Sequence, residues 1–300
     1  MNLVKNKTLI LGGNSYIGTH LFEHFNSDYA IRTYHSKPVE NGIYFNTLSM
    51  NLSKILKDIN NISHAVILLG DTNPESCAED IEKSNRLNIE SIKSIIDDLN
   101  EYGVKPIFTS SDIVFDGKKG NYDEEDPVSP ILTYGKQKVE IERYMQKMCD
   151  DFIITRISKV FGSQIGDKTL FTNWLDDISG NKEIYCAHDH RSNPIYIKDV
   201  VNSIAGLINS DCSGIFHLSG KKAYSRLELF EMLLDHTKKY LPVKVNVIKC
   251  SIHDIPLREK RPLNISMKSD KLTDTIGIKL HDTNDICKNI VKEYIKVKSK

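Results

Sequence analysis

The chain has 300 residues, a length that suits one large domain or two closely associated ones. Its 40 basic residues balance its 40 acidic residues, so net charge does not favour nucleic acid or a membrane surface as a partner. No apolar run approaches the ~20 residues that cross a bilayer, and the N-terminus lacks the apolar core of a signal peptide. Six cysteines with no Cys-x-x-Cys spacing predict free thiols in a reducing cytoplasm and no metal site.

The first thirty residues follow the order of a dinucleotide-binding unit. Thr8–Leu11 is an apolar run that predicts a buried strand, and Ile17, Leu21 and Phe25 form one stripe of a following helix. A glycine turn between a strand and a helix lets the helix N-terminus bind a pyrophosphate. We therefore expect cofactor contacts from the turn residues Gly12, Asn14, Ser15, Tyr16, Ile17 and Gly18. Ser15 occupies the place of the usual middle glycine, and an ordinary strand–turn–helix corner is the alternative interpretation.

The second predicted strand, Ala30–Tyr34, indicates which cofactor is used. An NAD site places an acidic residue at the end of this strand to bind the ribose 2′-hydroxyl. No Asp or Glu occurs between Tyr29 and Val39. Four polar or basic residues could instead bind a 2′-phosphate, namely Arg32, His35, Ser36 and Lys37. The segment therefore predicts NADPH in preference to NADH; the alternative is that these are solvated loop residues.

Strands and helices continue to alternate along the chain. Further strands are expected at 43–45, 64–70, 104–109, 152–156, 214–218 and 243–248, and helices at 88–100, after Pro130, and at 168–179, 200–209, 226–240 and 282–296. This alternation predicts an α/β fold with a Rossmann-type doubly wound parallel sheet. Residues 1–160 with about 195–223 would form the NADP-binding domain, and about 161–194 with 224–300 a smaller C-terminal substrate-binding lobe. Gly12, Gly70 and Ser111 fall at the carboxyl edge of the sheet, where ligands bind.

Tyr134 and Lys138 form the most informative pair in the chain. Residues at i and i+4 share a helix face, and a nearby ammonium favours the phenolate and lowers the pKa of a tyrosine. Such a tyrosine can exchange a proton with a carbonyl oxygen, which a serine hydroxyl can hold. Ser111, at the end of an apolar run, is the candidate serine. A Tyr-x-x-x-Lys spacing alone is common, so the rest of the chain must support it.

Several motifs, in order, resemble the extended short-chain dehydrogenase/reductases, and within them the dTDP-4-dehydrorhamnose reductase family. The similar segments lie at residues 110–117, 122–135, 156–162, 193–199, 214–220 and 261–264. The resemblance runs almost from end to end. It implies NADPH-dependent reduction of the C4 keto group of a nucleotide-linked 4-keto-6-deoxy sugar, for deoxysugar or surface polysaccharide biosynthesis.

The resemblance also implies roles for single residues. Ser111 would bind the substrate carbonyl, Tyr134 would donate the proton, and Lys138 would hold the nicotinamide ribose. Asn88 would brace the active-site helix, although a helix cap is the alternative. Substrate contacts are expected from Ser111, Asp112, Lys159, Arg191 and Arg261. Arg261 would bind the diphosphate or form a surface ion pair, and Lys159 stands where the family has an aromatic residue.

The residues that follow Ser111 distinguish this chain from two related classes of enzyme. A 4,6-dehydratase carries Asp-Glu there, and an epimerase–reductase of the GDP-fucose synthase kind carries a cysteine, whereas this chain has Asp112-Ile113. Two alternatives stay open: a reductase of a UDP-, CDP- or GDP-linked ketosugar, and a non-catalytic NADP-binding regulatory subunit. The expected partner is a nucleotide sugar, without nucleic acid, membrane or metal. A homodimer is left open, and a cytoplasmic location is expected.

Overall fold

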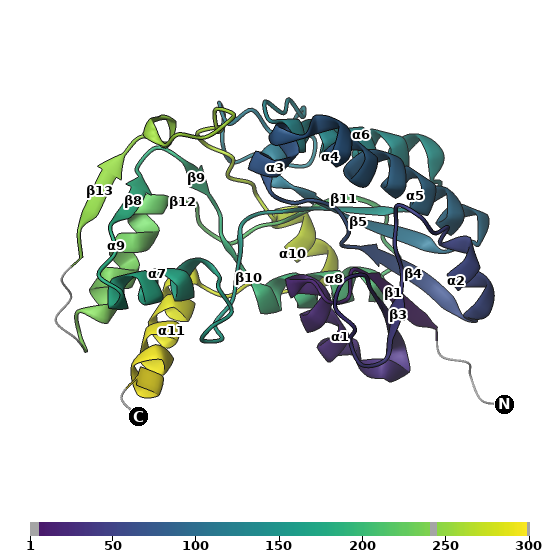
Figure 1. The fold of residues 1–300 in the computed structure, drawn as a ribbon, viewed down its shortest axis with the longest axis horizontal. Coiled ribbons are helices and arrows are strands. Elements are labelled where there is room, and N and C mark those ends of the chain that lie inside the picture. Colours follow the sequence, from purple (N-terminus) through teal and green to yellow (C-terminus); the bar gives the residue numbers. More distant parts are fainter. Residues whose placement is uncertain (1–5, 241–244, 299–300) are drawn as a thin grey trace.

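The computed structural model describes residues 6–240 and 245–298. Its centre is a seven-stranded parallel sheet with the strand order β11-β6-β5-β4-β1-β2-β3 (Figure 1). This sheet confirms the predicted Rossmann-type α/β fold. The strands are β1 (Lys7–Leu11), β2 (Ala30–Tyr34), β3 (Gly42–Tyr44), β4 (Ile62–Ile67), β5 (Lys105–Ser111), β6 (Ile153–Ile157) and β11 (Gly214–Leu218).

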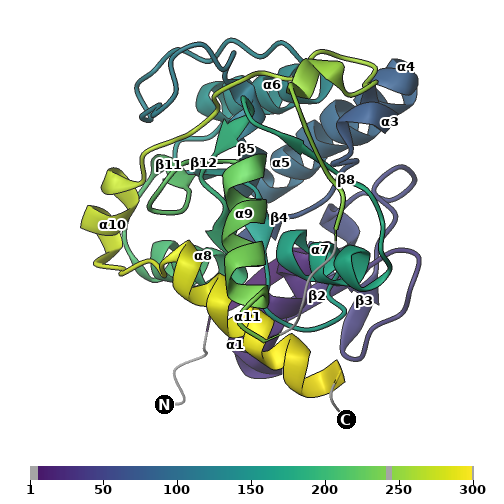
Figure 2. The same cartoon turned by 90° about the vertical axis from the view of Figure 1, so that its left-hand side faces the viewer.

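Helices cover both faces of the sheet (Figures 1 and 2). One face carries α2 (Ser53–Asp58), α3 (Pro74–Glu79), α4 (Ile81–Asn85), α5 (Ser91–Glu101) and α6 (Thr133–Met148), and the other carries α1 (Tyr16–Tyr29), α8 (Ile197–Asn209) and α10 (Asp270–Ile276). Side chains alternate along each strand, so Leu9 and Leu11 pack with α5 while Ile10 packs with α1 and α8. The two resulting cores fix the sheet whose carboxyl edge forms the site.

A second part of the chain stands beside the carboxyl edge of the sheet. In Figure 2, α11 (Thr283–Lys298) passes across α9 (Arg226–Thr237) and runs below α7 (Leu170–Ser179). Buried aromatic side chains join them: the Trp174 ring of α7 lies 5.2 Å from the Phe230 ring of α9, and the Tyr294 hydroxyl of α11 donates a hydrogen bond to the carbonyl of Leu175 in α7. Two-residue or four-residue strands complete this part, pairing as β10 (Ile195–Tyr196) with β7 (Val160–Phe161), β12 (Tyr224–Ser225) with β9 (Arg191–Ser192), and β13 (Val247–Cys250) with β8 (Ile184–Ala187).

The elements differ from the sequence prediction mainly at their ends. β5 runs two residues further than expected, so Ser111 is its last residue. The helix expected at 88–100 begins earlier, with a π-helical turn at Arg86–Glu90 before α5. The helix expected at 226–240 ends at Thr237. The strand expected at 243–248 falls partly outside the described residues, and β13 extends it to Cys250.

The division into two lobes remains a prediction, although β11 does pair with β6 in the main sheet. All six cysteines are free thiols, as expected. No helix within residues 6–240 and 245–298 is long and apolar enough to cross a membrane. Across the same residues, no group of three His, Cys, Asp or Glu side chains could hold a metal ion.

Candidate active site

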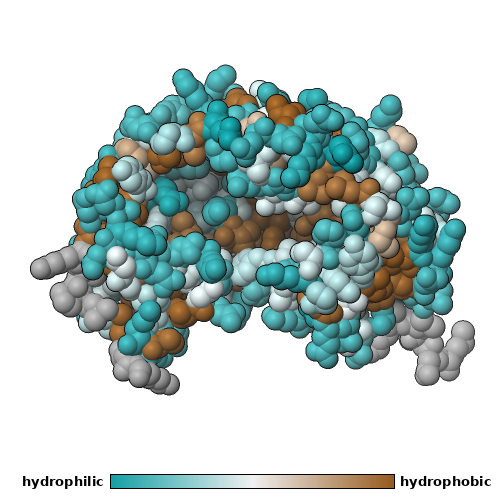
Figure 3. Space-filling view, in the orientation of Figure 1, coloured by the Kyte–Doolittle hydropathy of each residue, from teal (hydrophilic) through white to brown (hydrophobic). Residues whose placement is uncertain are grey.

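A cavity of about 960 Å³ lies at the carboxyl edge of the sheet, between the two parts of the chain. Figure 3 shows this face hollowed, with hydrophobic residues at the base of the hollow and hydrophilic residues around its rim. Its walls include the glycine turn, the predicted catalytic residues and the second part of the chain, through Ser15, Tyr16, Ile17, Ser111, Asp112, Tyr134, Lys138, Lys159, Trp174, Tyr185, Arg226 and Arg261. The cavity has the size of an ordinary small-molecule site.

The turn between β1 and α1 is packed too closely for larger residues. A Cβ on Gly13 would lie 2.3 Å from the Cβ of Arg32, and one on Gly18 would lie 2.4 Å from the carbonyl oxygen of Gly12. Gly12 has φ +87°, a left-handed conformation that favours glycine. Ser15 caps α1, because its hydroxyl accepts a hydrogen bond from the backbone N–H of Gly18 at 3.1 Å. This backbone cradle at a helix N-terminus fits a dinucleotide pyrophosphate.

Among the predicted 2′-phosphate ligands, Arg32 is held by the protein itself. Its guanidinium lies 4.0 Å from the Phe22 ring and donates two hydrogen bonds to the carbonyl of Glu40. The residues that follow β2 are exposed, namely His35, Ser36 and Lys37, and the His35 ring stacks on that of Tyr44 with ring centres 6.1 Å apart. These three therefore remain the candidates at this position.

Lys138 is buried beside Tyr134, but its ammonium does not reach the phenol. Nζ donates a hydrogen bond to the carbonyl of Thr109 at 2.8 Å and lies 5.5 Å from the centre of the Tyr134 ring. Burial lowers the pKa of Lys138 to about 8, while the carboxylate of Glu142 and the thiol of Cys77 act in the opposite direction. The ammonium form therefore still predominates at pH 7.

The prediction that Lys138 lowers the pKa of Tyr134 is wrong for this structure. Burial raises the pKa of Tyr134, and the nearby acidic groups of Asp112, Cys77 and Asp71 raise it further. The phenol therefore carries its proton at neutral pH, as a donor must, and the same shift makes it a weaker acid than a free tyrosine.

Ser111 and Asp112 form a hydrogen-bonded unit with Ser158. The Ser111 hydroxyl donates to Oδ1 of Asp112 at 3.0 Å, and the Ser158 hydroxyl donates to Oδ2 at 3.0 Å. Burial raises the pKa of Asp112 to about 6, although these two hydrogen bonds and the positive charge of Lys159 lower it. Sequence reasoning missed Ser158, which follows β6 directly beside the end of β5 and could have been found from its position at the strand end.

Asn88 joins the cofactor side of the site to the helix that carries Tyr134. It occupies the π-helical turn, accepts from the N–H of Asp71 at 2.7 Å, and donates to the side chain of Gln137 on α6 at 2.7 Å. Gly70 must be a glycine here, because it has φ +122° and a Cβ would lie 2.7 Å from Oδ1 of Asn88. The bracing contact is thus present, and Asn88 does not act as a helix cap.

The predicted substrate ligands do not all reach the cavity. Arg261 lies in the cavity wall and forms an ion pair with Glu75, and its buried Nη1 has no partner among the described residues. Lys159 lines the cavity with an exposed side chain. Arg191 does not line the cavity, because β9 directs its side chain away from it. Its guanidinium pairs instead with Glu228 at 2.9 Å.

The far end of the cavity was not predicted from sequence. The guanidinium of Arg226 lies 4.9 Å from the ring of Trp174 and donates a hydrogen bond to the carbonyl of Tyr185. The three residues come from α7, β8 and α9, and no sequence motif marks them. A stacked guanidinium and aromatic ring can hold a planar ligand group between polar and apolar surfaces.

The fold and the site together define a short-chain dehydrogenase/reductase. The sheet is of the Rossmann type, and a serine, a tyrosine and a lysine share one cavity with a glycine turn. The model of the family described as "RmlD substrate binding domain" matches residues 6–296. The chain therefore belongs to this family of RmlD-like sugar-nucleotide reductases, as its motifs indicated. The family is an oxidoreductase family that acts on nucleotide sugars with NADP.

Curated relatives include proteins of two kinds. The dTDP-4-dehydrorhamnose reductase of Aggregatibacter actinomycetemcomitans is 25% identical over 229 residues, which cover 73% of this chain and 77% of that protein. Methionine adenosyltransferase 2 subunit beta of Danio rerio is 26% identical over 225 residues, which cover 70% of this chain and 65% of the relative. The curated relatives thus include a protein named as a subunit as well as a protein named as a reductase.

Solved structures of dTDP-4-dehydrorhamnose reductases share the fold. The protein from Bacillus anthracis, solved in complex with NADP, has a TM-score of 0.83 at 19% identity, covering 96% of this chain and 99% of that one. A hypothetical reductase from Sulfolobus tokodaii has a TM-score of 0.81 at 24% identity, covering 93% and 98%.

Proposed function

We propose that the protein is an NADPH-dependent reductase of the C4 keto group of a nucleotide-linked 4-keto-6-deoxy sugar, with dTDP as the preferred nucleotide. The observation that carries the proposal is that Ser111, Tyr134 and Lys138 line the same cavity as the glycine turn. A cofactor on the turn and a ketone beside Ser111 would then share one enclosed space. The relatives named dTDP-4-dehydrorhamnose reductase support the choice of substrate.

The bound nicotinamide would supply the hydride, and the residues of the chain would handle the carbonyl oxygen. Tyr134 holds its phenolic proton at neutral pH and donates it to that oxygen. The Ser111 hydroxyl donates to Asp112 in the structure and turns to the substrate oxygen when a ketone binds. Lys138, fixed by the carbonyl of Thr109, supplies a positive charge beneath the site and a donor for the ribose.

The substrate contacts follow from charge. Arg261 has an unpartnered guanidinium nitrogen in the cavity wall, and a forked guanidinium suits the diphosphate of a nucleotide sugar. Lys159 offers its ammonium to a sugar hydroxyl, where the family pattern has an aromatic ring. His35, Ser36 and Lys37 would bind the 2′-phosphate of NADPH, and the complex of the Bacillus anthracis reductase with NADP supports this cofactor. The protein would act as a monomer or a homodimer.

A second candidate is a non-catalytic NADP-binding regulatory subunit. The relatives named methionine adenosyltransferase 2 subunit beta favour it, since they match this chain at similar identity. In such a protein the cavity would bind the cofactor without turning it over.

Turnover of NADPH separates the two candidates. The protein is supplied with dTDP-4-keto-6-deoxy sugars, before and after 3,5-epimerisation, and NADPH absorbance and the C4 configuration of the product are followed. We expect consumption of NADPH with one of these sugars and a clear preference over NADH. Turnover of a UDP-, CDP- or GDP-linked ketosugar alone would overturn the dTDP assignment. Cofactor binding without consumption, for every ketosugar, would favour the regulatory subunit.

A further inference from the structure

A second cavity, of about 620 Å³, lies behind one wall of the active-site cavity. Successive residues of the wall face opposite sides: Ser192 and Pro194 line the active-site cavity, whereas Asn193 between them lines the second cavity. The same alternation separates Tyr224, in the active-site cavity, from Ala223. The two cavities are therefore distinct spaces that share a wall.

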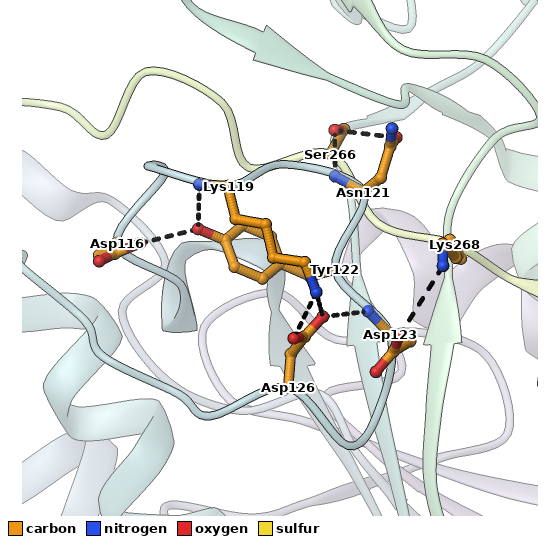
Figure 4. Close-up of polar contacts among 8 residues, drawn as sticks. All are labelled: Asp116, Lys119, Asn121, Tyr122, Asp123, Asp126, Ser266 and Lys268. Atoms are coloured by element: carbon orange, nitrogen blue, oxygen red, sulfur yellow. Dashed lines mark hydrogen bonds and ion pairs between the residues drawn. The ribbon is translucent and has the colours of Figure 1, made fainter.

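Positive charge is concentrated around this second cavity. Four lysines line it, Lys221, Lys222, Lys268 and Lys279, and Asp270 is the one acidic residue among its described lining residues. No ion pair within residues 6–240 and 245–298 engages Lys221, Lys222 or Lys279. Lys268 lies 3.8 Å from Asp123, a loose contact between two exposed side chains (Figure 4).

A buried amide adds a hydrogen-bond donor to the lysines. Asn193 is only 4% exposed, and its Oδ1 accepts from the N–H of Met267 at 2.9 Å. Asn193 also lines the second cavity. An amide in a cavity wall carries N–H donors that suit a ligand that accepts hydrogen bonds.

The wall around these groups is held in place by the loop that follows β5. The N–H of Asn121 donates to the hydroxyl of Ser266 at 2.8 Å (Figure 4). The N–H of Lys268 donates to the carbonyl of Tyr122, also at 2.8 Å. Tyr122 also stacks on Phe115 with ring centres 4.1 Å apart. The loop is thus pinned to residues 266–268, and the cavity is formed before any ligand arrives.

We propose that this second cavity binds a small molecule bearing two or more phosphate groups. Its lysines and the amide of Asn193 suit phosphate oxygens, and its volume suits a ligand of nucleotide size. The site does not depend on the reductase activity, since none of its lining residues also lines the active-site cavity.

The test is isothermal titration of the whole protein with inorganic tripolyphosphate. Wild-type protein is compared with the double variant Lys222→Glu/Lys279→Glu and with the control Lys57→Glu, which reverses the charge of an exposed lysine on α2 at the far end of the sheet. With saturating NADP and dTDP present to fill the active-site cavity, we expect one site in the wild type, a Kd raised about tenfold or more in the double variant, and little change in the control. Higher salt should weaken binding.

A third variant distinguishes the two cavities. Arg261→Gln should leave tripolyphosphate binding unchanged, because Arg261 belongs to the wall of the active-site cavity. Three results overturn the proposal: no binding at millimolar tripolyphosphate, equal weakening in Lys57→Glu and the double variant, or loss of binding in Arg261→Gln alone. Because the substituted lysines are exposed, unchanged thermal unfolding of the double variant would show that a loss of binding is local.

Discussion

At the scale of single residues, Tyr134 decides the proposed chemistry. Tyr134→Phe removes the proton donor and keeps the ring, so kcat should fall by about 10²–10⁴-fold while the Kd for NADPH changes little. The measurement is steady-state reduction together with fluorescence titration of NADPH. Tyr144→Phe on the same helix, whose hydroxyl bonds Asp97 near the surface, is the matched control and should keep its activity. A Tyr134→Phe protein with wild-type kcat would refute the assignment.

Asp112 should make stability depend on pH in a defined window. Its pKa is raised from 3.8 to about 6, so between these values the folded protein holds a proton that the unfolded chain has released. The contribution of Asp112 to stability therefore falls by roughly 3 kcal/mol as pH rises from about 4 to about 6. Above that pH it levels off. Below pH 4 both states are protonated, and Asp112 makes no pH-dependent contribution.

Asp112→Asn isolates this contribution, because the amide cannot ionise. Urea unfolding at several pH values between 4 and 7 should show the wild type losing stability relative to the variant as pH rises. Asp58→Asn, at the exposed last position of α2, should follow the wild type. A constant difference between Asp112→Asn and wild type across the window would show that the carboxyl titrates at its ordinary pKa.

At the scale of elements, the sequence predicts the strands of the sheet and its main flanking helices. It does not predict the local irregularities that position the site residues. Hydrophobic periodicity indicates a helix near 88–100, but it does not show that one turn is π-helical. The π turn inserts one residue and brings Asn88 to Gln137, which lies 49 residues further along the chain. Such a contact depends on the packing of α5 against α6, which no local pattern encodes.

Asn88→Ala should loosen the connection between the loop after β4 and α6. It removes hydrogen bonds to Asp71 and Gln137 and leaves their buried partners unsatisfied, which costs roughly 1–3 kcal/mol of stability. We expect a lower midpoint of chemical unfolding, weaker NADPH binding and a lower kcat together. Asn100→Ala, which loses one exposed hydrogen bond to Met148, should change neither NADPH binding nor kcat. Weakened stability with intact NADPH binding and kcat would make Asn88 merely structural.

At the scale of the whole molecule, the second part of the chain was the harder half to predict. Its sheet pairs are short and distant in sequence: Ile184 of β8 is in register with Val247 of β13. Strands of two to four residues give little periodic signal, so the prediction there was limited to helices and to one strand at 243–248. Arg191 was misplaced for the same reason, because its direction depends on the antiparallel pairing of β9 with β12.

The segment around residues 258–261 links the second part of the chain to the sheet domain across the cavity. Arg261 pairs with Glu75 and Arg258 with Glu79, both on α3, while Glu259 accepts from the backbone N–H of Thr133 at the start of α6. The Glu75 carboxylate thus pairs with the guanidinium that we propose binds the substrate diphosphate. The two anions should compete for Arg261.

Glu75→Gln should therefore tighten binding of the nucleotide. Removing one carboxylate from a partly buried arginine leaves its charge for the diphosphate, and a contribution near 1 kcal/mol corresponds to a Kd for dTDP lowered by roughly fivefold or less. Titration calorimetry with dTDP measures this without requiring turnover. Glu79→Gln is the matched control, since its partner Arg258 has a half-exposed side chain and does not line the cavity, and the Kd should stay unchanged. Weaker binding in Glu75→Gln would mean that Glu75 instead holds Arg261 in its binding position, so the pair would act together on the diphosphate.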